Sequence, residues 1–198
     1  MDKIFDLNYI NKLVDEVFKY NLTSYDDLPK YNLFLSQVVD YLDDTFDGKR
    51  FTTNVVQNYI RDEVITKPED GKKRGYSRTH LIQLILLGYM RPLLTTEEIK
   101  KVFSLAFNEI NDSNDDILSW EETYKVFTQI QEESLNNCLI SHLTHKSKFS
   151  NIEANFDLKD KEKGKIRIFL LVLSLISEAS VIKKLVQKII NEYHPDYS

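Results

Sequence analysis

The chain has 198 residues, of which 42% are hydrophobic and 29% charged, and its formal net charge is −5 at pH 7. This composition predicts a globular protein with a sizeable core and excludes an intrinsically disordered chain. With 5 Gly and 4 Pro, the chain has few residues for tight turns, which favours helices over a β-sandwich. The single cysteine, Cys138, can form no disulfide within the chain, so a cytoplasmic location is expected.

The first two predicted elements are amphipathic helices. Apolar residues recur at helical spacing from Ile4 to Phe18 and again from Leu33 to Phe46, with Pro29 between the two runs. The first run lacks the basic start and continuous apolar stretch of a secretory signal. Residues 1–29 are therefore expected to form an N-terminal helix whose function the sequence does not indicate.

Hydroxyl residues mark the starts of the next three helices. Thr52 or Thr53 is expected to cap a helix running to about Val64, and Ser77 one running to about Met90. Between these two helices, Pro68, Gly71 and Gly75 predict a turn-rich segment that could form a small two-stranded wing. A further helix is expected to open at Thr95, because Glu98 follows at the spacing of a capping box.

The C-terminal part is also predicted to be helical. Helical periodicity covers residues 120–143 and returns in one long helix from about Lys165 to Tyr193. Its most apolar stretch, residues 166–176, is about half of the ~20 residues needed to span a bilayer, so no membrane association is expected. The long helix carries enough apolar surface for a partner helix, which predicts a homodimer. A stripe of Trp120, Tyr124, Phe127 and Ile130 or Gln131 fits core packing, with a small-molecule pocket or a dimer seam as the alternative.

One region of this acidic chain is basic. Residues 49–78 hold eight Lys and Arg against four Asp and Glu. Within it, four polar side chains recur at i, i+3, i+4 and i+7 and therefore share one helix face: Asn54, Gln57, Asn58 and Arg61. Amides can pair with adenine and guanidinium with guanine, so this stripe has the groups that read base edges in a major groove. An ordinary solvated helix face is the alternative.

Cations and one tyrosine flank the polar stripe and are expected to contact the DNA backbone, which would make binding strongly dependent on salt. These residues are Lys49, Arg50, Lys72, Lys73, Arg74, Tyr76 and Arg78.

The segments "FTTNVVQNYIRDEVITKP" and "GYSRTHLIQLILLGYMRPLLTTEEIKKVF" carry two resemblances. Their order resembles MerR-type winged helix-turn-helix regulators, through Tyr59, Ile65, Pro68, Gly75, Tyr76, Leu81, Thr96, Glu98 and Ile99. The chain is still more similar to a bacterial family known as domain of unknown function 1836. That similarity rests on Thr53, Asn58, Tyr59, Pro68, Lys73, Tyr76, Ser77, His80, Glu98 and Ile99, with Tyr124 and Phe127 further on. Together they cover roughly residues 30–135 and imply a dimeric DNA-binding regulator.

Metal sites and catalysis find little support. Asp112, Asn114 and Asp116 have the spacing of an EF-hand loop, but Ile117 replaces the required Gly and Thr123 the bidentate Glu. An acidic connection between helices explains them better, and no metal is expected. The histidines lack partners at ligand spacing and the chain has no glycine-rich phosphate loop, so neither a cofactor nor an enzyme is expected.

The sequence therefore predicts a mainly α protein. Its expected parts are an N-terminal helix at 1–29, a winged helix-turn-helix lobe at 30–110, and a helical region at 111–198 that dimerises or binds an effector. The expected function is transcriptional regulation through double-stranded DNA. The alternative is a non-enzymatic adaptor that uses the winged fold and its basic wing on an acidic partner protein.

Overall fold

The computed structural model describes residues 23–46, 48, 51–68, 75–114, 116–134 and 160–193. Within these ranges the protein is helical, as predicted, and two isolated antiparallel bridges, Leu33 with Tyr76 and Glu109 with Asp112, are its only extended pairings. The chain divides into two compact units. One comprises Met1–Asn21 with Ile130–Leu185, and the other Leu22–Gln129 with Val186–Ser198.

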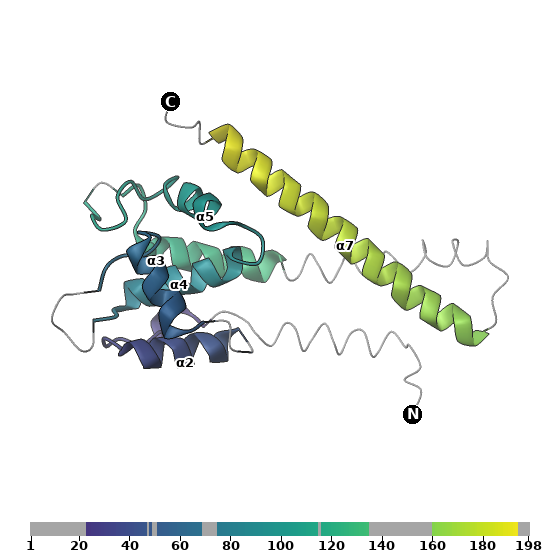
Figure 1. Ribbon diagram of the computed structural model, residues 1–198, viewed down its shortest axis with the longest axis horizontal. Helices are drawn as coiled ribbons and strands as arrows, with labels where there is room; N and C mark the ends of the chain where they lie inside the picture. The colour runs from purple at the N-terminus through teal and green to yellow at the C-terminus, as the bar shows by residue number, and fades with distance from the viewer. Residues whose placement is uncertain are drawn as a thin grey trace. The chain divides into compact units, whose positions relative to one another are not determined.

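The elements follow one another along the chain without a strand among the described residues (Figure 1). They are the short 3-10 helix η1 (Tyr25–Asp27), α2 (Leu35–Thr45), α3 (Thr53–Arg61), α4 (Arg78–Met90), α5 (Thr96–Phe103), a helix over residues 120–134, and α7 (Asp160–Tyr193).

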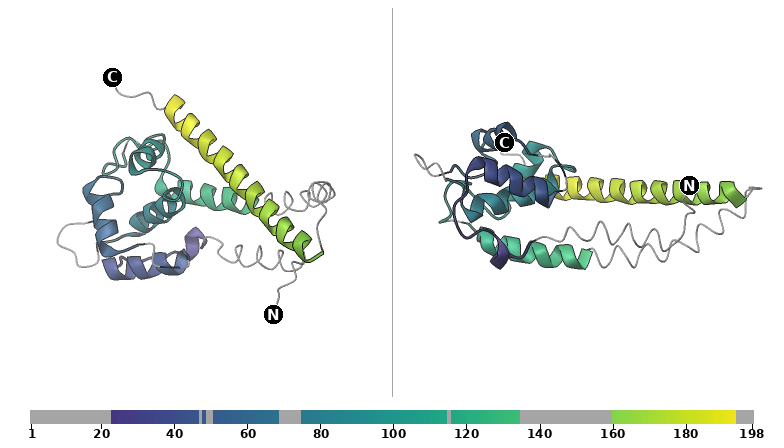
Figure 2. Two further views of the ribbon diagram at one scale, coloured as in Figure 1. Left: turned by 45° about the vertical axis from the view of Figure 1, so that its right-hand side comes forward. Right: turned by 90° about the horizontal axis from the view of Figure 1, so that it is seen from below.

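Helix α4 forms the centre of the second unit. Every residue from His80 to Gly88 is buried, because the sequence there is apolar on all sides and not on one stripe only. Helices α2, α3 and α5 lie around α4 in both sets of views (Figures 1 and 2). At Gly88 the backbone of α4 lies directly against the ring of Phe46, which leaves no room for a side chain.

The predicted helix starts are confirmed. Thr52 caps α3 by accepting a hydrogen bond from the Val55 amide at 3.3 Å, and Ser77 precedes α4 in a capping box with His80. Thr95 caps α5 through the predicted box, in which Glu98 accepts from the Thr95 amide at 2.8 Å. Because these caps depend on residues three positions apart, the local sequence suffices to predict them.

The aromatic stripe after residue 119 packs into the core of this unit. Trp120 and Tyr124 are buried, and the Trp120 ring stacks on Phe107 with centroids 3.6 Å apart. The Tyr124 hydroxyl donates to the Thr23 carbonyl at 2.8 Å, and burial raises the pKa of the phenol. Phe127 packs against the same core, whereas Ile130 at the end of the stripe is 53% exposed. The core-packing interpretation is thereby confirmed for the three aromatic residues.

Other expectations are met in part. Helix α2 is present where it was expected, and α7 begins at Asp160, before the predicted start. Residues 1–22 of the expected N-terminal helix lie outside the described residues, as do residues 135–143, and residues 23–29 contain only the 3-10 helix η1, because Leu28 is extended. None of the described helices has the length and apolar composition needed to cross a membrane. The predicted domain limits at residues 29 and 110 stay predictions.

Candidate functional site

The exposed face of α3 carries all four side chains that the sequence predicts to read bases. Asn54, Gln57, Asn58 and Arg61 are each exposed, while Val56 on the other side is completely buried. The alternation arises because apolar residues at helical spacing fix one side of α3 against the core. The structure therefore presents two carboxamides from Asn, one from Gln and one guanidinium together on a helix that is rigidly held.

Helix α3 ends three residues earlier than predicted, in a Schellman turn. The Val64 amide donates to the Tyr59 carbonyl at 2.8 Å, and the Glu63 amide donates to the Ile60 carbonyl at 3.1 Å. This turn requires a left-handed residue, and Glu63 adopts φ of 54° although glycine is usual there. Nothing in the sequence indicates this end, because the residue at the turn is not glycine.

Acidic groups balance the cations at this end of α3. The Arg61 Nε lies 3.1 Å from the Asp62 carboxylate, and the Lys67 ammonium lies 3.2 Å from the Glu63 carboxylate. All four side chains are largely exposed, so each pair contributes little to stability and can be replaced by a ligand. Arg61 is therefore available to an anion that competes with Asp62.

The chain that follows α3 is fixed by a buried glutamine. Gln83, completely buried in α4, accepts from the Thr66 amide at 3.0 Å and donates to the Thr66 hydroxyl at 2.6 Å. The Thr66 hydroxyl donates in turn to the Ile110 carbonyl at 3.0 Å, and the Lys67 amide donates to the Asn111 side chain at 2.9 Å. Sequence reasoning missed this anchor. Its only signal is one amide in the otherwise apolar run "LIQLILL".

The chain is fixed again at Tyr76. The Leu33 amide donates to the Tyr76 carbonyl at 2.8 Å, and the Tyr76 amide donates to the Leu33 carbonyl at 3.3 Å. The basic segment of residues 69–74, which holds Lys72, Lys73 and Arg74, lies outside the described residues, as do Lys49 and Arg50. The fold thus holds the chain on both sides of the segment, within three residues of one end and two of the other.

Two of the residues predicted to contact the DNA backbone have partners within the protein. Tyr76 is 8% exposed and its ring meets His80 edge-on, and burial raises the pKa of its phenol. The Arg78 guanidinium donates to the carbonyls of Pro29 and Leu28 at 3.3 and 3.4 Å and lies over the Tyr25 ring. The Tyr76 side chain thus joins the bridge to α4, and the Arg78 side chain joins α4 to η1 and the residues that follow it. Both contacts hold parts of the fold together.

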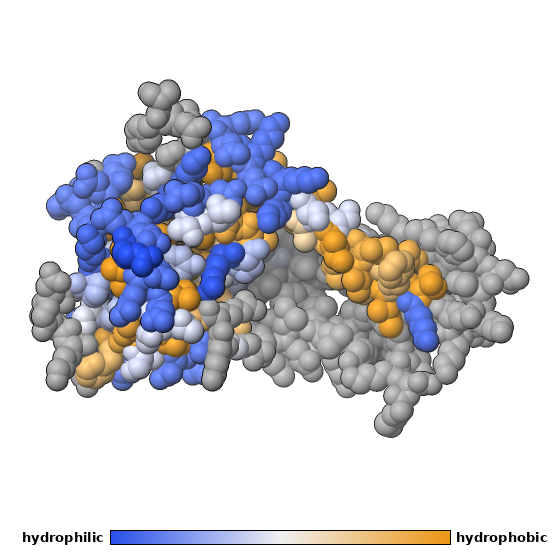
Figure 3. Space-filling view, viewed as in Figure 1, coloured by the Kyte–Doolittle hydropathy of each residue, from blue (hydrophilic) through white to orange (hydrophobic). Residues whose placement is uncertain are grey.

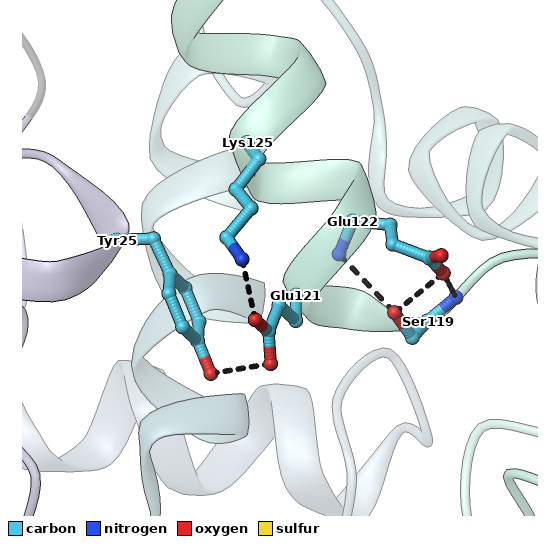
Figure 4. Close-up of polar contacts among 5 residues, drawn as sticks. All are labelled: Tyr25, Ser119, Glu121, Glu122 and Lys125. Atoms are coloured by element: carbon cyan, nitrogen blue, oxygen red, sulfur yellow. Dashed lines mark hydrogen bonds and ion pairs between the residues drawn. The ribbon is translucent and has the colours of Figure 1, made fainter.

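A second polar cluster joins η1 to the helix of residues 120–134 (Figure 4). The Tyr25 hydroxyl and the Lys125 ammonium donate to different oxygens of Glu121, at 2.8 and 2.6 Å. The hydrogen bond from Lys125, followed by that from Tyr25, holds the pKa of the Glu121 carboxyl below its usual range. At the start of the same helix, Glu122 accepts hydrogen bonds from the hydroxyl and the amide of Ser119, which together cap the helix and lower the pKa of Glu122.

A hollow of about 620 Å³ lies beside the two anchored ends, and its wall includes Lys67, Gly75 and Trp120. Most of the other groups around it are hydroxyls, amides and carboxylates, whereas sites for small molecules are usually lined by apolar side chains. The described residues contain no cluster of three potential metal ligands. Asp112, from the acidic loop, accepts hydrogen bonds from the backbone and side chain of Asn114.

Fold and surface together define a small helical domain with a rigid core and one exposed stripe of amides. The chain belongs to the family described as a domain of unknown function (DUF1836), whose model matches residues 23–127, just over half of the chain. The predicted membership is thereby confirmed, and the matched region covers η1 to the helix of residues 120–134. The chain matches none of the curated proteins and none of the solved structures with which it was compared.

Proposed function

We propose that this protein is a transcriptional regulator that inserts α3 into the major groove of duplex DNA. The observation that carries the proposal is the exposure of Asn54, Gln57, Asn58 and Arg61 together on one face of a helix fixed by the core. Carboxamides bind adenine at N6 and N7, and guanidinium binds guanine at O6 and N7, in bidentate pairs worth about 1–3 kcal/mol each.

The acidic groups of the domain favour α3 over its neighbour α2 as the helix that enters the groove. The exposed positions of α2 include Asp40 and Asp44, which would repel phosphate, whereas the stripe on α3 contains no carboxylate. The carboxylate of Asp62 competes for Arg61, so binding to a guanine must exchange one weak ion pair for another contact. Affinity should accordingly be modest.

Phosphate contacts are assigned to Lys72, Lys73 and Arg74, in the MerR-like winged arrangement that the sequence resembles. The anchors at Thr66 and Tyr76 support this part of the proposal, because they hold the start and end of the basic segment in the same domain as α3. Tyr76 and Arg78 are left out of the interface, since both are engaged within the protein.

The experiment is selection of bound sequences from random duplex DNA, followed by titration of the enriched duplex across a salt series. Gln57→Ala and Asn58→Ala should each weaken binding to the enriched site by roughly 5- to 150-fold, with little effect on random DNA. The matched control is Gln129→Ala, which removes the same exposed amide from the helix of residues 120–134.

The basic segment has a separate signature. Lys72→Ala/Lys73→Ala should weaken binding to every sequence alike and reduce the slope of log K against log salt by about 2, because two phosphate contacts are lost. Absence of binding by the wild-type chain at about 50 mM salt, a concentration at which phosphate contacts are strong, would overturn the proposal. Retention of an acidic protein partner under those conditions would favour the adaptor alternative.

A further inference from the structure

Helix α7 exposes an apolar seam that the rest of the described chain does not cover. Apolar residues recur along it at alternating intervals of four and three, the spacing of a coiled coil. They are Ile168, Val172, Leu175, Ala179 and Ile182, and the pattern continues in the sequence at Val186 and Ile189. Ile168, Leu175 and Ile182 keep 40%, 38% and 57% of their surface exposed. Figure 3 shows apolar surface along α7.

Spacing distinguishes this seam from its neighbours on α7. A second exposed row starts with Phe169, Leu173 and Ile176 but reaches Ser180 and Lys183 at the next two positions, so it ends after one heptad. A different face is half-buried, at Ile166, Leu170 and Ser174 among others. Among these rows, the one through Ala179 stays apolar for the longest stretch, from Ile168 to Ile189.

The charges that border this seam suit a second copy of the same helix in parallel register. With Val172 and Ala179 at a and Leu175 and Ile182 at d, Glu178 falls at g and Lys183 at e. In a parallel pair, residue g lies near residue e of the next heptad of the partner, five positions further on. Glu178 of each copy would therefore face the Lys183 position of the other, which gives two attractive pairs related by the symmetry.

We propose that two copies of this chain associate through α7 as a parallel, in-register pair of helices, with Ala179 meeting its own counterpart at the centre. The small side chain at position 179 allows the helices to approach closely, while Leu175 and Ile182 supply the buried area on each side. The association does not depend on what α3 binds, so it can fail or succeed independently of the DNA proposal.

The first test compares two adjacent residues of α7 by sedimentation equilibrium of the full chain. Ile182→Glu places a charge in the seam and should raise the dimer dissociation constant by at least about 100-fold. Val181→Glu is the matched control, because Val181 is equally exposed at 63% but lies at position c, away from the seam. Tryptophan fluorescence from Trp120 verifies that the other unit remains folded in both variants, and far-ultraviolet circular dichroism verifies that their helix content is kept.

Orientation is tested by cross-linking. In a Cys138→Ser background, Ala179→Cys should form an interchain disulfide on mild oxidation with copper phenanthroline, because residues at a face each other in a parallel pair. Val181→Cys should form far less of this interchain disulfide.

The charge pairs are tested by mixing two variants. A mixture of Glu178→Lys and Lys183→Glu chains should yield heterodimers in preference to either homodimer, by a few-fold for each restored pair of opposite charges.

Three results would overturn the proposal. The first is a wild-type chain that is monomeric at about 100 μM, a concentration well above the micromolar Kd typical of a weak specific complex. The second is an equal loss of dimer in Ile182→Glu and Val181→Glu. The third is an Ala179→Cys variant that cross-links no better than Val181→Cys. The last would indicate an antiparallel or different interface and not the parallel seam.

Discussion

The close contact between Gly88 and Phe46 predicts that adding one methyl group to α4 destabilises the domain. Alanine is about 1 kcal/mol better than glycine inside a helix, so Gly88→Ala should stabilise an uncrowded helix. Here a Cβ at position 88 would overlap the Phe46 ring and lie 2.5 Å from its Cε2 atom, against the ~3.5–4.0 Å of an ordinary carbon contact.

The Phe46 ring cannot easily move aside. It is 8% exposed and packs against Tyr89 and Phe51, with centroids 5.2 and 6.0 Å away. Overpacking a core costs typically ~1–3 kcal/mol, and the depth of this overlap places the cost at or above the upper end. After the gain of about 1 kcal/mol in helix propensity, Gly88→Ala should lower the free energy of unfolding by roughly 2 kcal/mol.

Urea titration followed by tryptophan fluorescence measures this change directly, because Trp120 is the single tryptophan and lies in the same core. The midpoint should fall by roughly 1 M. The control is the Phe46→Leu background, in which the Cε and Cζ atoms are absent and Gly88→Ala should become neutral or stabilising. An equal effect of Gly88→Ala in both backgrounds, or a stabilised single variant, would refute the reasoning.

Three further outcomes are expected. Glu63→Gly should be more stable than Glu63→Ala by about 1 kcal/mol in urea titration, because only glycine relieves the left-handed backbone while both variants lose the pair with Lys67. Gln83→Leu should cost about 1–3 kcal/mol and speed hydrogen exchange at the Thr66 amide, which would lose its acceptor; unchanged exchange would contradict the anchor. Since hydrogen bonds from Ser119 lower the pKa of folded Glu122, their stabilisation is complete above the unfolded pKa and is lost as pH falls through the folded one. Wild type should therefore lose stability more steeply than Glu122→Gln as the solution is acidified below about pH 5, and parallel curves would argue against this cap.

The features that sequence predicted well are those decided within one turn of helix. Caps at Thr52, Ser77 and Thr95, and the exposed stripe on α3, follow from residues three or four positions apart. Family membership was also predictable, since it depends on residue types at fixed spacing.

Features that depend on distant partners were not predictable. Tyr76 and Arg78 looked like free surface groups in a basic stretch, yet Arg78 reaches the carbonyls of Leu28 and Pro29, about fifty residues earlier. The anchor between Gln83 and Thr66 likewise joins residues that are 17 positions apart. The left-handed Glu63 was missed for another reason, since glycine is the residue that usually marks such a turn.

The two anchors that bracket residues 69–74 also bear on how this domain can evolve. Thr66 is held by hydrogen bonds to α4 and Tyr76 by hydrogen bonds to Leu33, and neither set of bonds involves a side chain of the segment between them. Doubling the length of such a connection costs only about 0.6 kcal/mol in closure entropy. The charge of this segment can therefore change without loss of the two anchors that flank it.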